Sequence, residues 1–357
     1  MIKNGKVLMA MSGGVDSSMS ALMLYEKGYE IIGVTLKVWD YNELENPLKK
    51  EHSFIQDARQ LAQKIGFPHY VVDAQEEFNK IVVHDFTSEY LSGRTPNPCA
   101  LCNPTIKWKL ILQKADELGC EFIATGHYAR INQENNRYFI SKGKDENKDQ
   151  SYMLWRLSQE QLKRTIFPLG NLTKKEIKER AEKEGYQLIA QQKESYEICF
   201  IPDNDYRSFL KKHNPEITNK YDGGNFVLTN GKIIGKHKGY PFYTIGQRKG
   251  LNIAVGVPLY VTQIIPESNT VVLGYKEELG KSCFEVKNFN LMKYADISEN
   301  MEVTTKIRYK DKGSKSTISV EKDRIKVEFS ENVNAIAPGQ SAVFYENEDV
   351  IGGGIII

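Results

Sequence analysis

The chain has 357 residues, more than one hydrophobic core usually supports, so two or three domains are expected. Its 40% hydrophobic and 26% charged residues are typical of a folded globular protein and exclude a disordered chain. The 48 basic side chains nearly balance the 46 acidic ones. Bulk charge therefore gives no indication of a nucleic-acid partner, and an RNA-binding surface would need local clustering of Lys and Arg.

No stretch is long and apolar enough to span a bilayer, so we expect no membrane association. The apolar run Val7–Met11 is too short for a secretory signal and predicts a buried first strand. We therefore expect a cytoplasmic protein. The five cysteines are Cys99, Cys102, Cys120, Cys199 and Cys283. An odd, thinly spread set is not a disulfide framework, and such thiols are buried fillers, metal ligands or reactive groups.

Apolar strands alternate with amphipathic helices in the first half of the chain. The expected strands are 6–11, 31–39, 69–74 and 122–127, and the expected helices are 18–27, 55–65 and 76–91. This alternation predicts a doubly wound α/β domain whose parallel sheet carries ligands at the carboxyl ends of its strands.

The second half changes character after a helix that Thr173 and Glu176 begin with a capping box. After about residue 205, period-two runs and turn signals such as Asn230-Gly231 replace helical patterns. We predict three domains: 1–205 as the nucleotide-binding and catalytic domain, 206–278 as a small central α+β domain, and 279–357 as a C-terminal β-barrel.

The strongest local motif is Ser12-Gly13-Gly14-Val15-Asp16-Ser17, between the first strand and the first helix. Paired glycines allow close approach of the backbone to a charged group, and N–H groups at a helix N-terminus hold anions. A lysine-bearing Walker motif is absent, which argues against ordinary γ-phosphate transfer. A plain glycine-rich turn is the alternative to a phosphate site.

Cys99 and Cys102 lie in Gly93-Arg94-Thr95-Pro96-Asn97-Pro98-Cys99-Ala100-Leu101-Cys102-Asn103. Asn103 and Pro104 suit the N-cap and first position of a helix, which predicts a helix over 104–118. Cys102 would then lie at the helix N-terminus, where the dipole lowers the thiol pKa. A reactive thiol is favoured, with half a zinc site or a structural role as the alternatives; no second CxxC or His pair supplies further zinc ligands.

Cys199 lies in Glu194-Ser195-Tyr196-Glu197-Ile198-Cys199-Phe200-Ile201 and by itself reads as a buried strand cysteine. Further motifs are Gly126-His127-Tyr128-Ala129, Lys148-Asp149-Gln150-Ser151-Tyr152, Phe242-Tyr243-Thr244-Ile245-Gly246-Gln247-Arg248-Lys249-Gly250-Leu251 and Ala337-Pro338-Gly339-Gln340-Ser341-Ala342. The glycine motif resembles that of PP-loop ATP pyrophosphatases. All the motifs together, in this order, resemble the bacterial tRNA-specific 2-thiouridylase family nearly end to end.

This resemblance implies a set of site residues. The ATP phosphates would be held by Ala10, Met11, Ser12, Gly13, Gly14, Val15, Asp16 and Ser17, with Leu36 and Gly126 near the adenosine. The target uracil, flipped out of the anticodon loop, would lie beside Asn97, Pro98 and Cys99. Further tRNA contacts would be His127, Lys148, Asp149, Gln150, Arg308, Tyr309 and Gln340. Without the family, His127 reads as a histidine bonded to its own loop, and a basic strand over 306–312 reads as an ordinary solvated face.

The resemblance also implies the reaction. Uracil O2 attacks the α-phosphorus of ATP, Mg²⁺ neutralises the departing pyrophosphate, and Cys199 delivers sulfur as a persulfide. Cys102 completes the transfer and leaves a Cys102–Cys199 disulfide. The partners would be a tRNA with a wobble uridine and a persulfide donor, either a sulfur-relay protein or a cysteine desulfurase. No resident metal site is expected.

Two positions depart from the family pattern. Cys99 stands where the family commonly has aspartate, and Tyr196-Glu197 stands where a glycine is common. We hypothesise that Cys99 reopens the Cys102–Cys199 disulfide, because one thiol of a CxxC pair can attack a disulfide made by the other. Filling the space of the aspartate is the alternative.

Two other functions remain open at this point. The first is a PP-loop ligase acting on a small molecule, which would need neither paired cysteines nor an RNA-binding barrel. The second is a non-catalytic tRNA-binding protein that keeps the glycine motif for stability. Pyrophosphate release that depends on tRNA separates all three functions.

Overall fold

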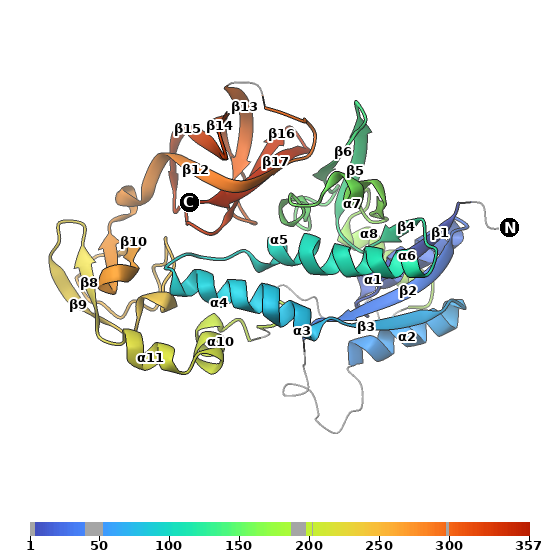
Figure 1. Cartoon of the computed structure of the whole chain (residues 1–357), viewed down its shortest axis with the longest axis horizontal. Helices are drawn as coiled ribbons and strands as arrows, with labels where there is room; N and C mark the ends of the chain where they lie inside the picture. The colour runs from blue at the N-terminus through green and yellow to red at the C-terminus, as the bar shows by residue number, and fades with distance from the viewer. Residues whose placement is uncertain (1–3, 40–52, 187–197, 202, 298–299) are drawn as a thin grey trace.

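A computed structural model describes residues 4–39, 53–186, 198–201, 203–297 and 300–357. Within them the chain forms three sheets, which Figure 1 shows as a parallel sheet at the N-terminal end, a small central domain and a C-terminal barrel. Residues 194–197, including Tyr196-Glu197, lie outside the described residues. No described helix has the length and apolar character needed to cross a membrane.

The first domain contains a five-stranded parallel sheet with the strand order β3-β2-β1-β4-β7. Its strands are β1 (Lys6–Ala10), β2 (Glu30–Lys37), β3 (His69–Asp73), β4 (Phe122–Ala124) and β7 (Thr165–Ile166). The order reverses beside β1, which pairs with β2 on one side and β4 on the other. Such a switch point leaves a crevice at the carboxyl ends of the strands, and the glycine motif follows β1 at this crevice. The predicted doubly wound α/β class is confirmed.

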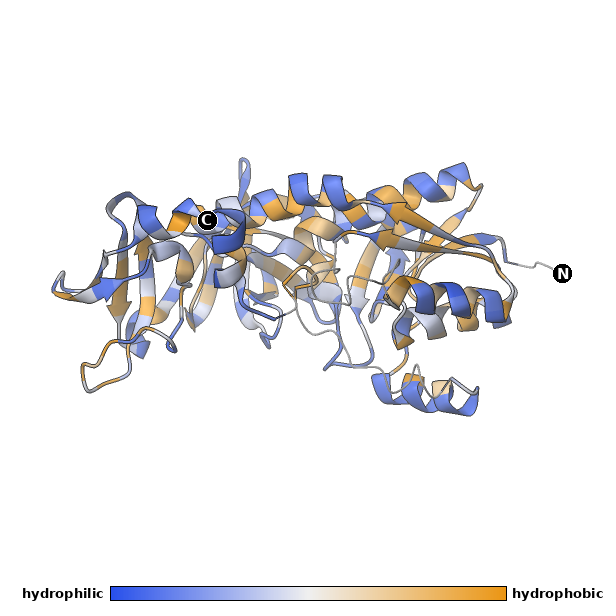
Figure 2. Cartoon of the chain, turned by 90° about the horizontal axis from the view of Figure 1, so that it is seen from below, coloured by the Kyte–Doolittle hydropathy of each residue, from blue (hydrophilic) through white to orange (hydrophobic). Residues whose placement is uncertain are grey.

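Helices cover both faces of this sheet because residues along β1 alternate between two cores. Val7 and Met9 pack with α1 (Val15–Glu26) and α2 (Ser53–Ile65). Leu8 packs on the other face, together with Ile111 of α6 (Lys109–Glu117). Figure 2 shows hydrophobic colour on the strands and hydrophilic colour on the outer sides of the helices.

Two long helical segments cross the middle of the molecule. The first joins α3 (Gln75–Phe78), the π-helical turn η1 (Asn79–Val83) and α4 (His84–Leu91), which confirms the helix expected there. The second joins α5 (Pro98–Cys102), the π-helical turn η2 (Asn103–Trp108) and α6.

The second segment corrects the predicted helix over 104–118. The helix begins at Pro98, and its N-cap is Asn97, whose side chain accepts a hydrogen bond from Ala100 N at 3.3 Å. Asn97-Pro98 and Asn103-Pro104 carry the same cap signal, and the earlier pair starts the helix. Pro104 lacks an N–H and would disturb a regular α-helix, and the wider η2 turn accommodates it inside the segment. Cys102 therefore lies within the helix and not at its N-terminus.

The remaining elements of the first domain connect this core to the barrel. They are β5 (Ala129–Glu134), β6 (Arg137–Lys142), η3 (Ser151–Met153), α7 (Gln159–Lys163) and α8 (Lys174–Lys183). The capping box of Thr173 and Glu176 at the start of α8 is confirmed. Hairpin strand β6 pairs with barrel strand β17 (Asp349–Ile356) through Ser141 and Asp349, which docks the two domains.

The central domain has a four-stranded sheet with the order β10-β11-β8-β9. Its elements are α10 (Tyr206–His213), α11 (Glu216–Tyr221), β8 (Gly224–Leu228), β9 (Ile233–His237), η4 (Tyr240–Phe242), β10 (Tyr260–Ile265), η5 (Pro266–Ser268), β11 (Thr270–Gly274) and η6 (Lys276–Leu279). The turn predicted at Asn230-Gly231 joins β8 to β9, and Gly231 has the positive φ of 85° that favours glycine.

The C-terminal barrel has six strands and closes by pairing β12 with β17. Besides β17 they are β12 (Gly280–Leu291), β13 (Met301–Lys306), β14 (Ser314–Glu321), β15 (Arg324–Asn334) and β16 (Ser341–Glu346). The predicted barrel is confirmed, but the basic strand expected over 306–312 is wrong. Strand β13 ends at Lys306 because the carboxylate of Asp311 accepts a hydrogen bond from Ile307 N, and Asp311 N donates to Arg308 O, which together make a turn.

Candidate active site

The glycine loop, Ala10–Ser17, connects β1 to α1 at the switch point of the parallel sheet. Gly14 is the N-cap of α1 and no side chain caps the helix, so the first-turn N–H groups stay open to an anion. Ser17 Oγ accepts a hydrogen bond from Ser12 N at 3.1 Å and donates one to Gly14 O at 3.1 Å. The loop is therefore held in an anion-binding shape by its own side chains.

Two glycines are required by the packing of this loop. Gly13 has a φ of 75°, and a Cβ there would overlap the carbonyl oxygen of Phe54 at the start of α2. Gly126 follows β4, and its Cβ would lie 2.9 Å from the carbonyl carbon of Asp16. Gly126 thus touches the glycine loop. Leu36 is near the end of β2 and is partly buried in the core on the α6 side.

Asp16 is paired with two other side chains of the first domain. Its carboxylate binds the ammonium of Lys174 through both oxygens at 2.7 Å, and Tyr128 OH donates to it at 2.7 Å. Lys174 is the first residue of α8 and is only 8% exposed. This contact links the glycine loop to α8 and places a buried cation beside it.

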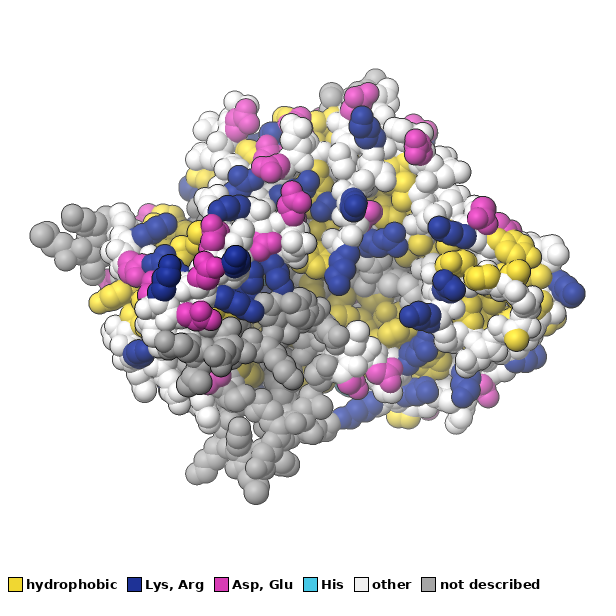
Figure 3. Space-filling view, turned by 180° about the vertical axis from the view of Figure 1, so that it is seen from behind, with side chains coloured by type: hydrophobic (Ala, Val, Ile, Leu, Met, Phe, Trp, Pro, Cys, Tyr) yellow, Lys and Arg dark blue, Asp and Glu magenta, His cyan; other side chains and the backbone are white. Residues whose placement is uncertain are grey.

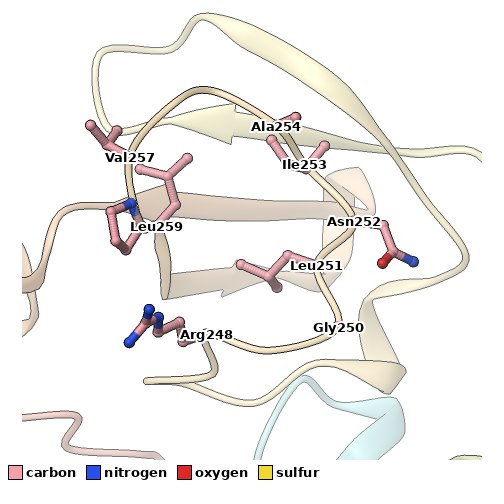
Figure 4. A pocket seen from close by; sticks show the side chains of 9 residues that line it. Arg248, Gly250, Leu251, Asn252, Ile253, Ala254, Val257 and Leu259 are labelled. Carbon is pink, nitrogen blue, oxygen red and sulfur yellow. The ribbon is translucent and has the colours of Figure 1, made fainter.

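Two surface hollows lie away from these residues. One, of about 820 Å³, is lined by Asp73, Ala74, Gln75, Glu76, Glu77, Lys80 and Ile81. The other, of about 380 Å³, lies within the loop Arg248–Leu259 of the central domain (Figure 4). Neither contains a cysteine or a residue of the glycine loop, and the acidic lining of the first disfavours phosphate.

The helical segment that begins at Pro98 presents two thiols. Cys99 is half-buried in its first turn, and Cys102, one turn later, is 4% exposed. Burial raises the pKa of the Cys102 thiol to about 12 and also raises that of Cys99. The predicted lowering of the Cys102 pKa by a helix N-terminus is therefore wrong, because the residue is buried in the helix interior.

Cys199 lies in a tight turn closed by the hydrogen bond from Ile201 N to Ile198 O at 2.9 Å. Phe200 and Ile201 are buried, and Phe200 packs edge-on against Phe78 and Phe86 of the long helical segment. The Cys199 residue itself is exposed, so it is not the buried strand cysteine that its neighbours suggest. Its pKa is raised to about 11 because the surrounding chain desolvates the thiol.

Cys99, Cys102 and Cys199 form what we call the cysteine cluster. The charges of Cys199 and Cys99 raise the pKa of Cys102, and the charge of Cys99 raises that of Cys199. Lys107, on η2, interacts with all three and lowers the pKa of each. The structure thus brings together two cysteine motifs that are far apart in the sequence. Among the described residues, no group of three or more His, Cys, Asp or Glu could hold a metal ion.

The loop before this helix is fastened to the barrel. Gln340 Nε2 donates to the carbonyl oxygens of Thr95 at 3.1 Å and Pro96 at 2.8 Å. Thr95 N donates to Pro338 O at 2.8 Å, and Asn97 Nδ2 donates to Ser341 Oγ at 3.2 Å. The barrel therefore determines where the start of the cysteine helix lies.

The loop 148–150 has a structural function in this fold. The Asp149 carboxylate is 8% exposed and accepts hydrogen bonds from Gly143 N, Ser151 N and Ser151 Oγ. Gln150 Oε1 accepts one from Tyr128 N at 3.0 Å. Asp149 is thus committed to its own loop, while Lys148, like Gln150, is half-buried.

Residues expected to contact tRNA converge around the cysteine helix. Tyr309 lies 6.3 Å from Tyr152, centroid to centroid, and its pKa is raised by burial and then by the charges of Asp149 and Cys99. Arg308 beside it is exposed. Figure 3 shows Lys and Arg side chains gathered around a hollow with a hydrophobic floor. Lys and Arg side chains therefore gather locally on the face that Figure 3 draws, which the bulk charge did not reveal.

His127 is held by neighbouring side chains and is shielded from solvent. Its Nδ1 lies 2.7 Å from Thr125 Oγ1, and its ring lies 5.5 Å from Trp108. Burial, assisted by the charge of Lys107, lowers its pKa to about 3. His127 is therefore neutral and could meet RNA only by hydrogen bonding or stacking.

Several residues of the site were missed by the sequence analysis. They are Lys107, Trp155 and Lys174, while Tyr152 and Ser341 appeared in motifs without a role of their own. Ser341 Oγ accepts from Trp155 Nε1 at 3.0 Å, and Tyr152 OH donates to Ser341 O at 2.7 Å. Only the position of Lys174 directly after a recognised N-cap was a usable signal, because contacts between distant segments leave no local pattern.

A doubly wound sheet with a glycine loop at its switch point, next to a thiol cluster and a closed β-barrel, defines a PP-loop type of nucleotide-binding enzyme. Family descriptions cover nearly the whole chain: "tRNA methyl transferase HUP domain" over 5–203, "tRNA methyl transferase PRC-barrel domain" over 207–275 and "Aminomethyltransferase beta-barrel domain" over 281–356.

Whole-chain relatives identify the family. The tRNA-specific 2-thiouridylase MnmA of Cytophaga hutchinsonii is 54% identical and aligns over 100% of this chain and 98% of its own. That of Amoebophilus asiaticus is also 54% identical, over 99% of this chain and 96% of its own. That of Salinibacter ruber is 51% identical, over 100% and 95%. The chain belongs to the tRNA-specific 2-thiouridylases, which are tRNA sulfurtransferases.

Proposed function

We propose that this protein uses ATP to replace O2 of the wobble uridine of tRNA with sulfur carried as a persulfide on Cys199. The observation that supports this most is the cysteine cluster. Cys102 and Cys199 come from distant segments, share one electrostatic environment and lie in the domain that also carries the glycine loop.

ATP fits the glycine loop because the loop offers open N–H groups without side-chain bulk. Residues Ala10–Ser17 bind the phosphates, with Gly126 against the loop and Leu36 near the adenosine. Uracil O2 attacks the α-phosphorus, so pyrophosphate leaves and N3 gives up its proton. The negative charge of the pyrophosphate would be screened by Mg²⁺ if the nucleotide binds as its magnesium complex.

Sulfur transfer then proceeds in two balanced steps. The terminal sulfur of the Cys199 persulfide bonds to C2 and AMP departs with the former O2. The Cys102 thiolate attacks Cys199 Sγ, a Cys102–Cys199 disulfide forms, and the electron pair of the broken S–S bond stays on the sulfur at C2. N3 takes up a proton, which gives 2-thiouridine. The persulfide sulfur is reduced while the two cysteines are oxidised, so a thiol reductant must reset the enzyme.

The tRNA reaches this site through the face that joins the first domain to the barrel. Asn97, Pro98 and Cys99 border the flipped uracil, because they form the helix start that the barrel positions. Arg308 and Tyr309, with Lys148 close by, contact the RNA backbone, and residues 279–357 serve as the tRNA-binding domain. The exposed turn of Cys199 receives the persulfide from a sulfur-relay protein or a cysteine desulfurase.

The test combines purified protein, ATP, Mg²⁺, a tRNA with a wobble uridine and a cysteine desulfurase with cysteine. We expect pyrophosphate release only with tRNA present, and 2-thiouridine detected by mass spectrometry of the digested tRNA. Pyrophosphate release without tRNA would instead support a ligase for a small molecule. Tight tRNA binding without pyrophosphate release would leave only an RNA-binding role.

A further inference from the structure

Lys107 lies on the one irregular turn of the cysteine helix. Lys107 follows Cys102, the N-cap of η2, by five residues. The backbone hydrogen bonds of this π-helical turn join residues that are five apart in the chain. In a regular α-helix, residues five apart are rotated by about 140° from one another. A π-helical turn contains more residues per turn, which reduces this rotation, and the charge of Cys102 acts on Lys107 across the turn.

The groups that face the Lys107 ammonium come from three parts of the chain. Cys99 and Cys102 lie on its own helix, Cys199 lies on the turn 198–201, and His127 follows β4. His127 is neutral, and Lys107 forms no ion pair with a carboxylate among the described residues. In the part of the chain that the structure describes, the three thiols are therefore the groups that can balance its charge.

The direction of the pKa shifts agrees with this geometry. Burial lowers the pKa of Lys107, but the three thiolates raise it, and the net change is a rise. Lys107 in turn lowers the pKa of each thiol against the larger effect of burial. A half-buried lysine that has no carboxylate partner within the described ranges suits a site in which negative charge appears on sulfur during the reaction.

We propose that Lys107 is the counter-ion of the sulfur-transfer thiolates, holding its ammonium where Cys102 and the Cys199 persulfide carry negative charge. This role rests on the proposed function. Cys102 must lose its proton to solvent before it attacks Cys199 Sγ, and Lys107 stabilises that thiolate inside a desolvated cluster. It also stabilises the persulfide anion before attack on C2. Lys107 itself remains protonated and forms no covalent bond.

The test compares Lys107→Met, which removes the charge, with Lys107→Arg, which keeps it. Lys109→Met is the matched control, because Lys109 lies on the same helix and pairs with Glu77 at the surface. Iodoacetamide alkylation of Cys102 and Cys199 is followed by peptide mass spectrometry from pH 6 to 11, without ATP or tRNA. Exposed Cys283 serves as the internal rate reference and buried Cys120 as the reporter of folding.

We expect Lys107→Met to lower the alkylation rates of Cys102 and Cys199 at pH 8 by roughly tenfold, which corresponds to a pKa rise of about one unit. Lys107→Arg should stay within about threefold of the original protein, and Lys109→Met should not differ from it. The pH–rate profile of single-turnover thiolation from a preformed persulfide should move its acidic limb to higher pH by the same amount. The rate of tRNA-dependent pyrophosphate release should stay unchanged.

Unmoved alkylation profiles in Lys107→Met would overturn the proposal. So would equal losses of pyrophosphate release and thiolation with Cys120 still protected, because they would place Lys107 in ATP or RNA binding. If Lys107→Met exposes Cys120, Lys107→Gln repeats the comparison. A shifted alkylation profile in a protein that makes no 2-thiouridine would uphold the counter-ion and overturn the proposed function, so the two failures are distinguishable.

Discussion

The glycine loop lies within residues 10–17 of one strand–helix junction, while the cysteine cluster takes its members from a helix start and from a distant turn. The loop offers backbone N–H groups that no side chain caps. The cluster consists of thiol side chains whose pKa values are raised by burial. The loop that begins the cysteine helix is hydrogen-bonded to the barrel through Gln340 and Ser341.

This difference separates two kinds of failure. A change in the glycine loop should block activation of the base, with little effect on the thiols. A change near the cluster should leave activation working and stop sulfur transfer. Pyrophosphate release and 2-thiouridine formation report on the two regions separately, so each variant can be assigned to one of them.

The largest effect is expected for Cys199→Ser. A hydroxyl cannot carry a persulfide, so 2-thiouridine should fall below detection while tRNA-dependent pyrophosphate release continues. Mass spectrometry of digested tRNA measures the first quantity and a coupled phosphate assay the second. Cys283→Ser, at another exposed cysteine, is the control and should retain full activity. Thiolated tRNA made by Cys199→Ser would remove this cysteine from the sulfur path.

Gly13→Ala should act on the other region with the next largest effect. Alanine at this position would have to adopt the positive φ of Gly13, which is unfavourable for a residue with a Cβ, and its Cβ would overlap Phe54 O. The loop must therefore move, at a cost of about 1–3 kcal/mol. Pyrophosphate release should fall by roughly 10- to 100-fold, while the alkylation rates of Cys102 and Cys199 stay unchanged.

The control for this variant is Gly14→Ala. Its Cβ would come no closer than 3.8 Å to Ser12 Oγ and needs no positive φ, so pyrophosphate release should fall far less. Equal losses in the two variants would mean that loop bulk, and not the conformation at Gly13, limits ATP binding.

Gln340→Ala tests whether the barrel positions the cysteine helix. Removing the amide leaves the carbonyls of Thr95 and Pro96 without these donors, which costs about 1–3 kcal/mol. We expect thiolation at saturating tRNA to fall about tenfold, because the helix start is displaced, with tRNA affinity nearly unchanged.

Arg308→Ala gives the contrasting result at the same interface. Arg308 is exposed, and loss of one phosphate contact should weaken tRNA binding and reduce the slope of log K against log salt by about one. Thiolation at saturating tRNA should persist. If Gln340→Ala shows the same weaker, flatter binding curve, Gln340 contacts tRNA as the family resemblance implies, and its hydrogen bonds to the loop are secondary.

The smallest effect is expected for Cys99→Ala. The Cys99 thiolate would attack Cys102 Sγ in the Cys102–Cys199 disulfide, form a Cys99–Cys102 disulfide and release Cys199, after which an external dithiol reduces the pair. Because burial raises the pKa of Cys99, this path is slow near neutral pH. A single turnover should be unaffected and multiple turnovers a few-fold slower, with rescue by added dithiol. If Cys99→Ala matches the original protein in both single and multiple turnovers, Cys99 only fills space.

The local patterns predicted the fold well where they were unambiguous. The strand alternation, the capping box at Thr173 and the hairpin turn at Asn230-Gly231 were all confirmed. The cysteine helix was predicted to begin at Pro104 but begins at Pro98, because two Asn-Pro pairs carry the same cap signal. The choice between them depends on Asn97. Its side chain caps the helix by accepting a hydrogen bond from Ala100 N, and it donates one to Ser341 of the barrel.

The sequence by itself determined the class of fold, the anion-binding glycine loop and the family, because these are recorded in residues that are close together in the chain. Tertiary structure alone decided the chemistry of the thiols. The burial of Cys102, the exposure of Cys199 and the approach of Lys107 arise from packing between distant segments. The pKa of a side chain follows the solvent and charges around it, and these are set only when the chain is folded.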